Sequence, residues 1–156
     1  ETVEVVISAD EALPEGSIDL NAPDVHAFYN AQAGKEPSLS IADTSAPFEL
    51  DGESFVSIED YWRSDRVREA EIDSRQALLL AALRVQYATS AAAESGLRSH
   101  LLSTAGNRVV CVDIDPWLGM QAAGGISSGQ NELGKALMAL RAELLQEAWA
   151  YVRSPG

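Results

Sequence analysis

The feature that most constrains the fold is an apolar stripe near the end of this 156-residue chain. Its members recur at steps of four, three, four and four residues: Leu133, Leu137, Leu140, Leu144 and Ala148. Met138, Leu145 and Trp149 widen the stripe. This spacing predicts an amphipathic helix over about residues 131–152, with one face buried against a core.

Turn and cap signals organise the middle of the chain. Residues 47–56 predict a β-hairpin, because Asp51-Gly52 suits a tight turn in which both positions need positive φ. Ser57 then opens a helix, with Asp60 three residues later in a weaker form of a capping box. We expect this helix to run to about Ile72.

The remaining segments are assigned by composition and periodicity. Helices are expected over residues 74–92 and 93–103, the second ending before Gly106, and strands over residues 2–8 and 108–112. Acidic residues 9–25 and residues 31–46 suggest loops, residues 26–30 a short apolar anchor, and glycine-rich residues 119–129 a flexible loop. Together these predict an α+β fold that is mainly α-helical, with a few short strands.

Composition excludes several classes of protein. Apolar residues make up 46% and charged residues 22%, as in a soluble globular domain, and no run approaches the ~20 apolar residues of a membrane span. Eleven basic against 24 acidic residues give a net charge of −13, which disfavours direct nucleic-acid binding. Cys111 is the only cysteine, which fits a reducing, cytoplasmic setting. The chain begins with Glu1 rather than Met, so we expect either a trimmed chain or one domain of a longer parent protein that could hold additional domains.

Glu59 and two arginines are the first candidates for chemistry. Glu59 falls in the first turn of its predicted helix, where it is either a dipole-complementing surface residue or a general acid/base or ribose-binding carboxylate. Arg63 and Arg66 follow at spacings that place them on the same helix face. They form either an intrahelical ion pair with Glu59 or a cationic wall for a phosphate.

A second group follows the strand over residues 108–112. Asp113, Asp115 and Trp117 combine carboxylates with an aromatic ring, which suits stabilisation of an oxocarbenium-like sugar cation. The alternative is an ordinary turn at Asp115 with Trp117 in the core.

The third group leads into the last helix. The glycines between Gly119 and Asn131 would let backbone N–H groups hold an anion, unless the segment is only a mobile loop. Lys135, one turn into the helix, is a solvated lysine, a phosphate contact or an amine nucleophile. Two histidines and one cysteine argue against a metal site, and Cys111 reads as a core residue.

Residues 129–141 resemble the C-terminal signature of the YbiA-like family, also called NADAR. That signature, Gly-x-Asn-x-Leu-Gly-x-x-Leu-Met-x-x-Arg, is met at every fixed position. The resemblance extends through an opening aromatic pair at Phe28-Tyr29, the Asp-Gly hairpin and helix start over residues 50–61, and residues 101–106. It implies a YbiA-like domain over residues 26–153, preceded by an N-terminal strand and acidic loop over residues 1–25.

The resemblance implies a hydrolase that cleaves the N-glycosidic bond of a ribosylated small molecule or nucleotide, without a cofactor. Riboflavin-pathway intermediates and ADP-ribosyl-guanine are the substrate classes. The catalytic residues would be Glu59 and Asp115. The substrate-binding residues would be Arg63, Arg66, Trp117, Gly119, Asn131 and Lys135.

The chain departs from the family in the catalytic helix. Asp60, Arg63 and Arg66 stand where the family has His, Gln and Lys. If that lysine forms an imine with ring-opened ribose, Arg66 cannot replace it, because a guanidinium is no amine nucleophile. Two rivals therefore stand beside the glycosidase: a catalytically silent module that binds ADP-ribose, a nucleotide or a protein, and a different hydrolase in which Arg63 and Arg66 clamp an anion.

Overall fold

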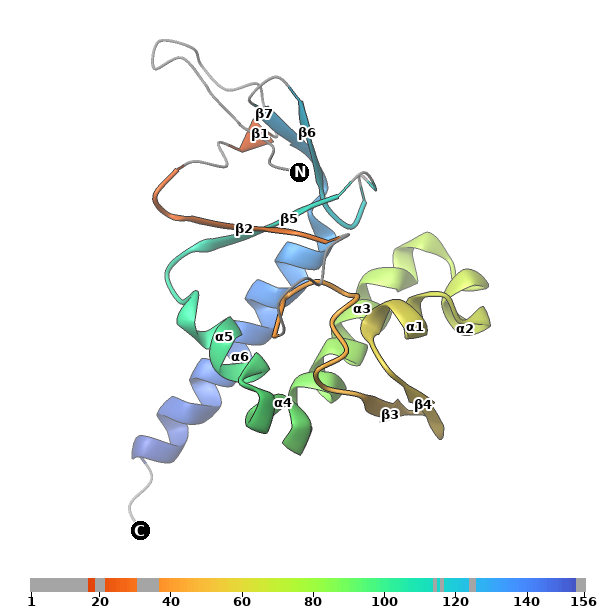
Figure 1. The fold of residues 1–156 in the computed structure, drawn as a ribbon, viewed down its shortest axis with the longest axis vertical. Coiled ribbons are helices and arrows are strands. Elements are labelled where there is room, and N and C mark those ends of the chain that lie inside the picture. The colour runs from red at the N-terminus through yellow and green to blue at the C-terminus, as the bar shows by residue number, and fades with distance from the viewer. Residues whose placement is uncertain are drawn as a thin grey trace.

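The computed structural model describes residues 17–18, 22–30, 37–113, 115, 117–123 and 126–153. Within these residues the chain has an α+β fold, in which a long C-terminal helix crosses beneath a twisted sheet and shorter helices pack beside it (Figure 1). The predicted strand over residues 2–8 lies outside the described residues. No helix in the described part of the chain is long and apolar enough to cross a membrane.

The main sheet has the strand order β1-β7-β6-β5-β2. Its strands are β1 (Ser17–Ile18), β2 (Val25–Tyr29), β5 (Arg108–Val112), β6 (Met120–Ala123) and β7 (Ile126–Gly129). Strands β2 and β5 pair in parallel over five residues each, so their carboxyl ends lie at the same sheet edge. The apolar anchor predicted over residues 26–30 is thus largely a strand, which the short apolar segment alone did not reveal.

The predicted hairpin is confirmed. Strands β3 (Phe48–Leu50) and β4 (Glu53–Phe55) pair antiparallel around Asp51 and Gly52, whose φ values are 53° and 82°. Both turn residues therefore occupy the left-handed region that a primed turn requires.

The helix after the hairpin begins as predicted but ends early. Ser57 accepts a hydrogen bond from the backbone N–H of Asp60 and so caps α1 (Ile58–Trp62). The chain then breaks at residues 63–64 and restarts as α2 (Asp65–Arg68). The prediction of one helix to Ile72 is wrong, because Ser64 takes an extended conformation before α2.

Three helices follow: α3 (Ile72–Tyr87), α4 (Ser90–Ser95) and α5 (Leu97–Ser103). The helix predicted over residues 93–103 is interrupted, because Gly96 has a φ of 88° and ends α4 in a left-handed conformation. Gly106, also with a φ of 88°, stands in the turn before β5.

The glycine-rich segment over residues 119–129 contains two paired strands, so its assignment as a loop is wrong. Strands β6 and β7 pair antiparallel from Met120 opposite Gly129 to Ala123 opposite Ile126. These segments contain small residues of low strand propensity. They form strands because their backbone groups pair with each other and with the neighbouring strands β5 and β1.

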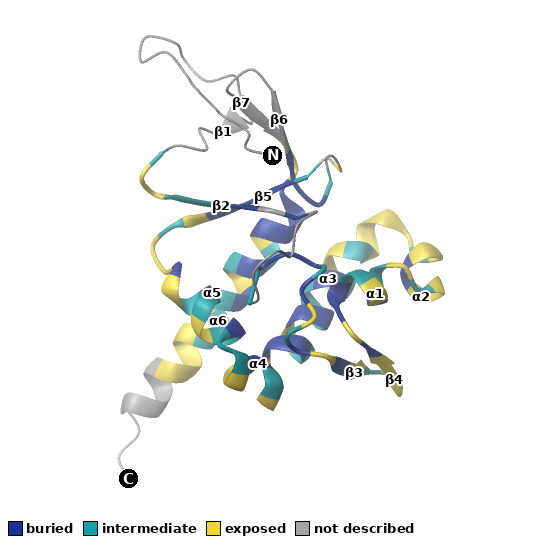
Figure 2. Cartoon of the chain, in the orientation of Figure 1, coloured by how far each residue is buried: buried dark blue, intermediate teal, exposed yellow. Residues whose placement is uncertain are grey.

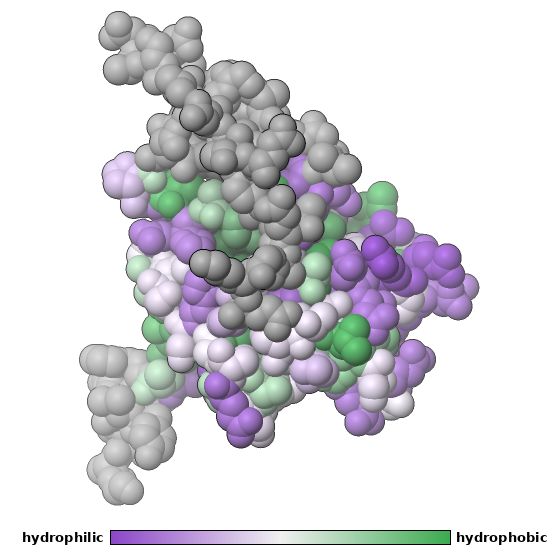
Figure 3. Space-filling model, in the orientation of Figure 1, coloured by the Kyte–Doolittle hydropathy of each residue, from purple (hydrophilic) through white to green (hydrophobic). Residues whose placement is uncertain are grey.

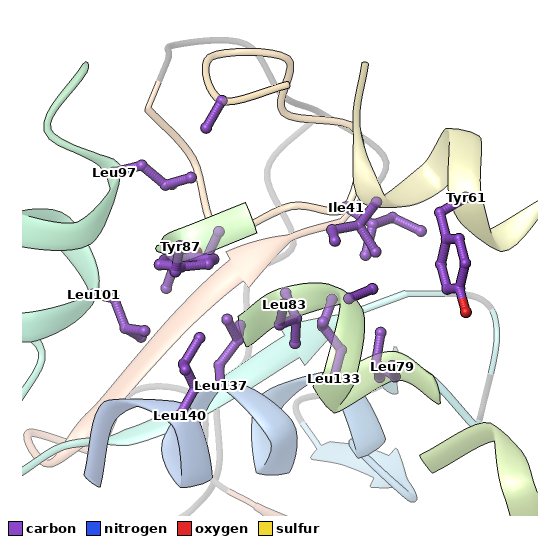
Figure 4. Close-up of a cluster of buried hydrophobic side chains, with 14 of the residues drawn as sticks. Ile41, Tyr61, Leu79, Leu83, Tyr87, Leu97, Leu101, Leu133, Leu137 and Leu140 are labelled. Carbon is purple, nitrogen blue, oxygen red and sulfur yellow. The ribbon is translucent and has the colours of Figure 1, made fainter. Parts of the chain in front are cut away.

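The C-terminal helix α6 (Glu132–Arg153) confirms the first prediction. Figure 2 shows that the buried residues of α6 lie in its N-terminal part, and residues 145–148 are exposed. The core where α6 meets α3 and α5 is drawn in Figure 4. Its fully or almost fully buried side chains include Leu79, Leu83, Tyr87, Leu97, Leu101, Leu133, Leu137 and Leu140. Backbone hydrogen bonds join the start of α6 to residues 117–119, where candidate site residues lie.

Candidate functional site

A carboxylate and an amide meet where the parallel strands β2 and β5 end. Asn30 follows β2 and Asp113 follows β5, and the side-chain amide of Asn30 donates a 2.7 Å hydrogen bond to Asp113 Oδ2. The backbone N–H of Asn30 also donates to the carbonyl of Val112. The pairing of the two strands therefore holds this polar contact at the sheet edge.

Asn30 links this edge to the segment before α1. Its Oδ1 atom accepts a 2.9 Å hydrogen bond from the backbone N–H of Ile41. The carbonyl of Ile41 in turn accepts a 2.8 Å bond from the backbone N–H of Glu59. A continuous series of hydrogen bonds thus runs from Asp113 to the start of α1. It passes through the side chain of Asn30 and the backbone of Ile41.

Glu59 presents its carboxylate to solvent. Its side chain is 39% exposed and lies 3.6 Å from Arg63, whose side chain is 78% exposed. The predicted ion pair at this spacing is confirmed. An exposed pair of this kind contributes only about 0.3–0.5 kcal/mol to stability, so both groups can reorganise around a ligand.

Two tryptophans connect α1 to the turn after β5. The rings of Trp62 and Trp117 stack with centroids 5.7 Å apart and an interplanar angle of 20°. Asp115 shapes this turn, because its Oδ1 atom accepts hydrogen bonds from the backbone N–H groups of Trp117 and Leu118. Of the two predictions for Asp115, the ordinary turn is therefore confirmed.

We call the group Asn30, Glu59, Trp62, Asp113, Asp115 and Trp117 the strand-end site. It combines carboxylates from two elements with a paired aromatic surface. Such an arrangement can exchange protons, stabilise a cation and stack on a planar ring. Hydrophilic side chains cover the neighbouring surface over α1 and α2, at the right of Figure 3.

Arg66 does not share the face of Glu59. It forms an ion pair with Asp51 of the hairpin turn. Because α1 ends at Trp62, the regular helical spacing that would have aligned Glu59, Arg63 and Arg66 is lost. Arg66 instead lines a separate cavity of about 520 Å³ between the hairpin and α1–α2, together with Tyr61 and three carboxylates besides Asp51.

Asn131 is buried in the scaffold. Its Oδ1 accepts a 2.9 Å bond from the N–H of Cys111, and its Nδ2 donates a 3.0 Å bond to the carbonyl of Val109. Its φ of 52° turns the chain from β7 into α6. The side chain thus joins the start of α6 to β5, and its described bonds go to backbone groups.

The glycines beside Asn131 permit close packing. A Cβ at Gly119 would lie within 3.0 Å of Cys111 and Asp113. At Gly134, a Cβ would overlap the carbonyl of Val109 and the amide of Asn131. The absence of a side chain at Gly119 and at Gly134 therefore allows residues 117–119 and α6 to lie close to β5.

Backbone donors at the start of α6 are already bonded. The N–H groups of Asn131, Glu132 and Leu133 donate to the carbonyls of Gly119, Trp117 and Leu118, respectively. These three N–H groups are therefore not free to bind the anion that the glycine pattern had led us to expect. They hold the Trp117 turn in place instead.

Lys135 lies apart from the strand-end site. Its ammonium group is 3.2 Å from Oε1 of Glu132. Both line a cavity of about 240 Å³ between α3 and α6, with Gln76, Ala77, Leu80 and Ala136. Sequence reasoning missed Glu132, because an acidic residue in a first helical turn is the ordinary pattern for a solvated cap.

Cys111 is buried, and this burial, with Asp113 and Asp115 nearby, raises the pKa of its thiol. A thiol held in its neutral form is a poor nucleophile. In the described part of the chain, no group of three or more His, Cys, Asp or Glu side chains is arranged to hold a metal ion.

The sequence alone does not mark Asn30 as a site residue. It also does not distinguish Asp113, which bonds to Asn30, from Asp115, which forms the turn.

Comparison with protein-family models, with curated proteins and with solved structures finds no match to this chain. A function for this chain is therefore inferred from the residues of the site and from the resemblance of residues 26–147 to the YbiA-like family.

Proposed function

We propose that this chain is an N-glycoside hydrolase of the YbiA-like type, acting on a ribosylated small molecule or nucleotide. The observation that supports it most is the hydrogen-bonded connection from Asp113 through Asn30 and Ile41 to Glu59, beside the stack of Trp62 and Trp117. This connection holds the carboxylate of Asp113 and the backbone of Glu59 in place, and the Glu59 carboxylate projects from that fixed position beside Arg63. A carboxylic acid can protonate the departing base, a carboxylate can stabilise the sugar cation, and an aromatic face can stack on the base.

In the proposed reaction, the bond between the sugar carbon and the base nitrogen breaks, and its electron pair leaves with the base. Glu59, as the acid, gives its proton to the departing nitrogen. Water then adds to the sugar carbon and returns a proton to Glu59. Each turnover thus consumes one water molecule and regenerates the carboxylic acid.

The other residues of the site act on binding and charge. Asp115, with Asp113 beside it, stabilises the positive charge that develops on the sugar ring. Trp117 offers a face on which the base stacks. Arg63, exposed beside Glu59, contacts a phosphate of the substrate, since a guanidinium suits phosphate geometry.

The experiment offers the protein two substrate classes, ribosylated riboflavin-pathway intermediates and ADP-ribosyl-guanine, and measures the free base by chromatography and mass spectrometry. The proposal predicts catalytic release of the base from at least one of them. Absence of release from both substrates, from a sample whose fold is verified by circular dichroism, would contradict it.

A second candidate is a silent binding module on the same scaffold. Two observations favour it: Arg66 is engaged by Asp51, and Asn131 is engaged by β5. The signature residues around α6 then preserve a fold rather than a reaction. Calorimetry that detects ADP-ribose binding without any product would support this module over the hydrolase.

A further inference from the structure

The cavity between α3 and α6 is separate from the strand-end site. We call it the α3–α6 cavity, and it is lined by Gln76, Ala77, Leu80, Glu132, Lys135 and Ala136. Its volume of about 240 Å³ is below the ~300 Å³ at which drug-sized ligand pockets begin. A ligand that fills it is therefore a small metabolite rather than a nucleotide.

Glu132 gives this cavity a buried charge. Its side chain is only 4% exposed, and its carboxylate accepts hydrogen bonds from the side-chain amide of Gln76 and the ammonium group of Lys135. Burial of a carboxylate costs several kcal/mol unless its oxygens are well paired. A carboxylate with two acceptor oxygens has room for a further donor from a ligand.

Lys135 supplies the opposite charge at the cavity mouth. Its side chain is 60% exposed, so its ammonium group can shift toward a ligand at little cost. A simple cationic ligand on Glu132 would meet repulsion from Lys135, and a simple anion on Lys135 would meet repulsion from Glu132. A ligand that carries both charges satisfies both side chains.

The rest of the lining selects the body of the ligand. Ala77, Leu80 and Ala136 offer small aliphatic surfaces without a charged group. We propose that the α3–α6 cavity binds a free aliphatic α-amino acid, whose ammonium group contacts Glu132 and whose carboxylate contacts Lys135. This proposal does not depend on glycoside hydrolysis, because none of its residues belongs to the strand-end site.

The test is calorimetric titration of the protein with leucine and with three analogues that each lack one feature. Leucinamide lacks the carboxylate, N-acetyl-leucine lacks the ammonium group, and glycine lacks the aliphatic side chain. The proposal predicts saturable leucine binding that is weaker by roughly tenfold or more for each analogue. No leucine binding, or equal binding of leucinamide or N-acetyl-leucine, would overturn it.

Variants then locate the binding site. Lys135→Met and Glu132→Gln should each weaken leucine binding by about tenfold to a hundredfold, as expected for loss of a hydrogen bond to a charged group. Arg84→Met is the matched control, since Arg84 pairs with Glu143 outside the cavity. Unchanged affinity in Lys135→Met, in a sample whose fold is verified by circular dichroism, would refute the assignment even if Glu132→Gln failed to fold.

Discussion

The amide of Asn30 donates a 2.7 Å hydrogen bond to the carboxylate of Asp113, across two parallel strands that are 83 residues apart in sequence. Asn30 is buried, and its Oδ1 atom also accepts the backbone N–H of Ile41. One side chain therefore joins the sheet edge to the segment that enters α1. The candidate site depends on this junction more than on any single catalytic group.

Replacement of Asn30 tests the junction. Asn30→Ala leaves the backbone N–H of Ile41 and the carboxylate of Asp113 without this partner, so we expect a loss of roughly 2–4 kcal/mol in the free energy of unfolding. Urea denaturation measures it. Asn30→Asp keeps an acceptor for Ile41 but places two carboxylates together, and its deficit should shrink as the pH is lowered and one of them is protonated. A deficit that does not change with pH would argue against this contact.

Asn131 is expected to be a structural residue. Asn131→Ala removes two buried hydrogen bonds to β5 and forces alanine into a left-handed conformation, which together should cost about 3–5 kcal/mol. Asn131→Gly removes the same bonds but fits the positive φ, so it should be less destabilising by about 1 kcal/mol. Thermal and urea unfolding compare the two. Equal stability of Asn131→Ala and the parent protein would contradict the proposed link between α6 and β5.

Gly134 provides a test of helix docking. In an exposed helix, replacement of glycine by alanine stabilises by about 1 kcal/mol. Here the added methyl group would overlap the carbonyl of Val109, so we expect Gly134→Ala to lower the melting temperature clearly. Ala139→Gly, at an exposed position of α6, measures the ordinary helix propensity in the same helix. An increase in melting temperature for Gly134→Ala would show that α6 does not lie this close to β5.

A histidine pair predicts pH dependence in the acidic range. The ring of His26 meets that of His100 edge to face, and burial followed by the charge of His100 lowers the pKa of His26 from its usual 6.5. The unfolded chain therefore binds a proton before the folded chain does. This contribution to stability is complete above pH 6.5, declines as the pH falls below it, and levels off below the folded-state pKa.

NMR titration of the His26 ring measures that pKa directly. His100→Gln should move it upward, because the repulsive charge is removed, and His26→Gln should flatten the acid side of the stability profile. A His26 pKa at or above 6.5 in the folded protein would exclude this explanation.

Local signals predicted much of the scaffold. Asp51-Gly52 specified the hairpin, Ser57 and Asp60 specified the cap of α1, and the leucine stripe specified α6. Each of these depends on residues within a few positions of one another. For such elements, the physical preferences of neighbouring residues are enough to predict the structure from the sequence.

Features that depend on contacts between distant parts of the chain could not be predicted from the sequence. Residues 120–123 and 126–129 become strands because β6 pairs with β5 and β7 pairs with β1, pairings that the glycine-rich sequence does not predict. Glu132 is an ordinary first-turn acid until Gln76 and the wall of α3 bury it. The place of Arg66 likewise depends on Asp51, fifteen positions earlier.

The most direct measurement is the rate of base release by Glu59→Gln compared with that by the parent protein, on whichever ribosylated substrate the parent cleaves. Glu69→Gln, at an exposed carboxylate in the separate cavity beside Arg66, is the matched control. We predict that kcat falls by about 10²–10⁴-fold in Glu59→Gln, the usual contribution of a general acid, while Glu69→Gln retains the parent rate. Equal turnover by Glu59→Gln and the parent protein would contradict the proposed role of Glu59 and the strand-end site.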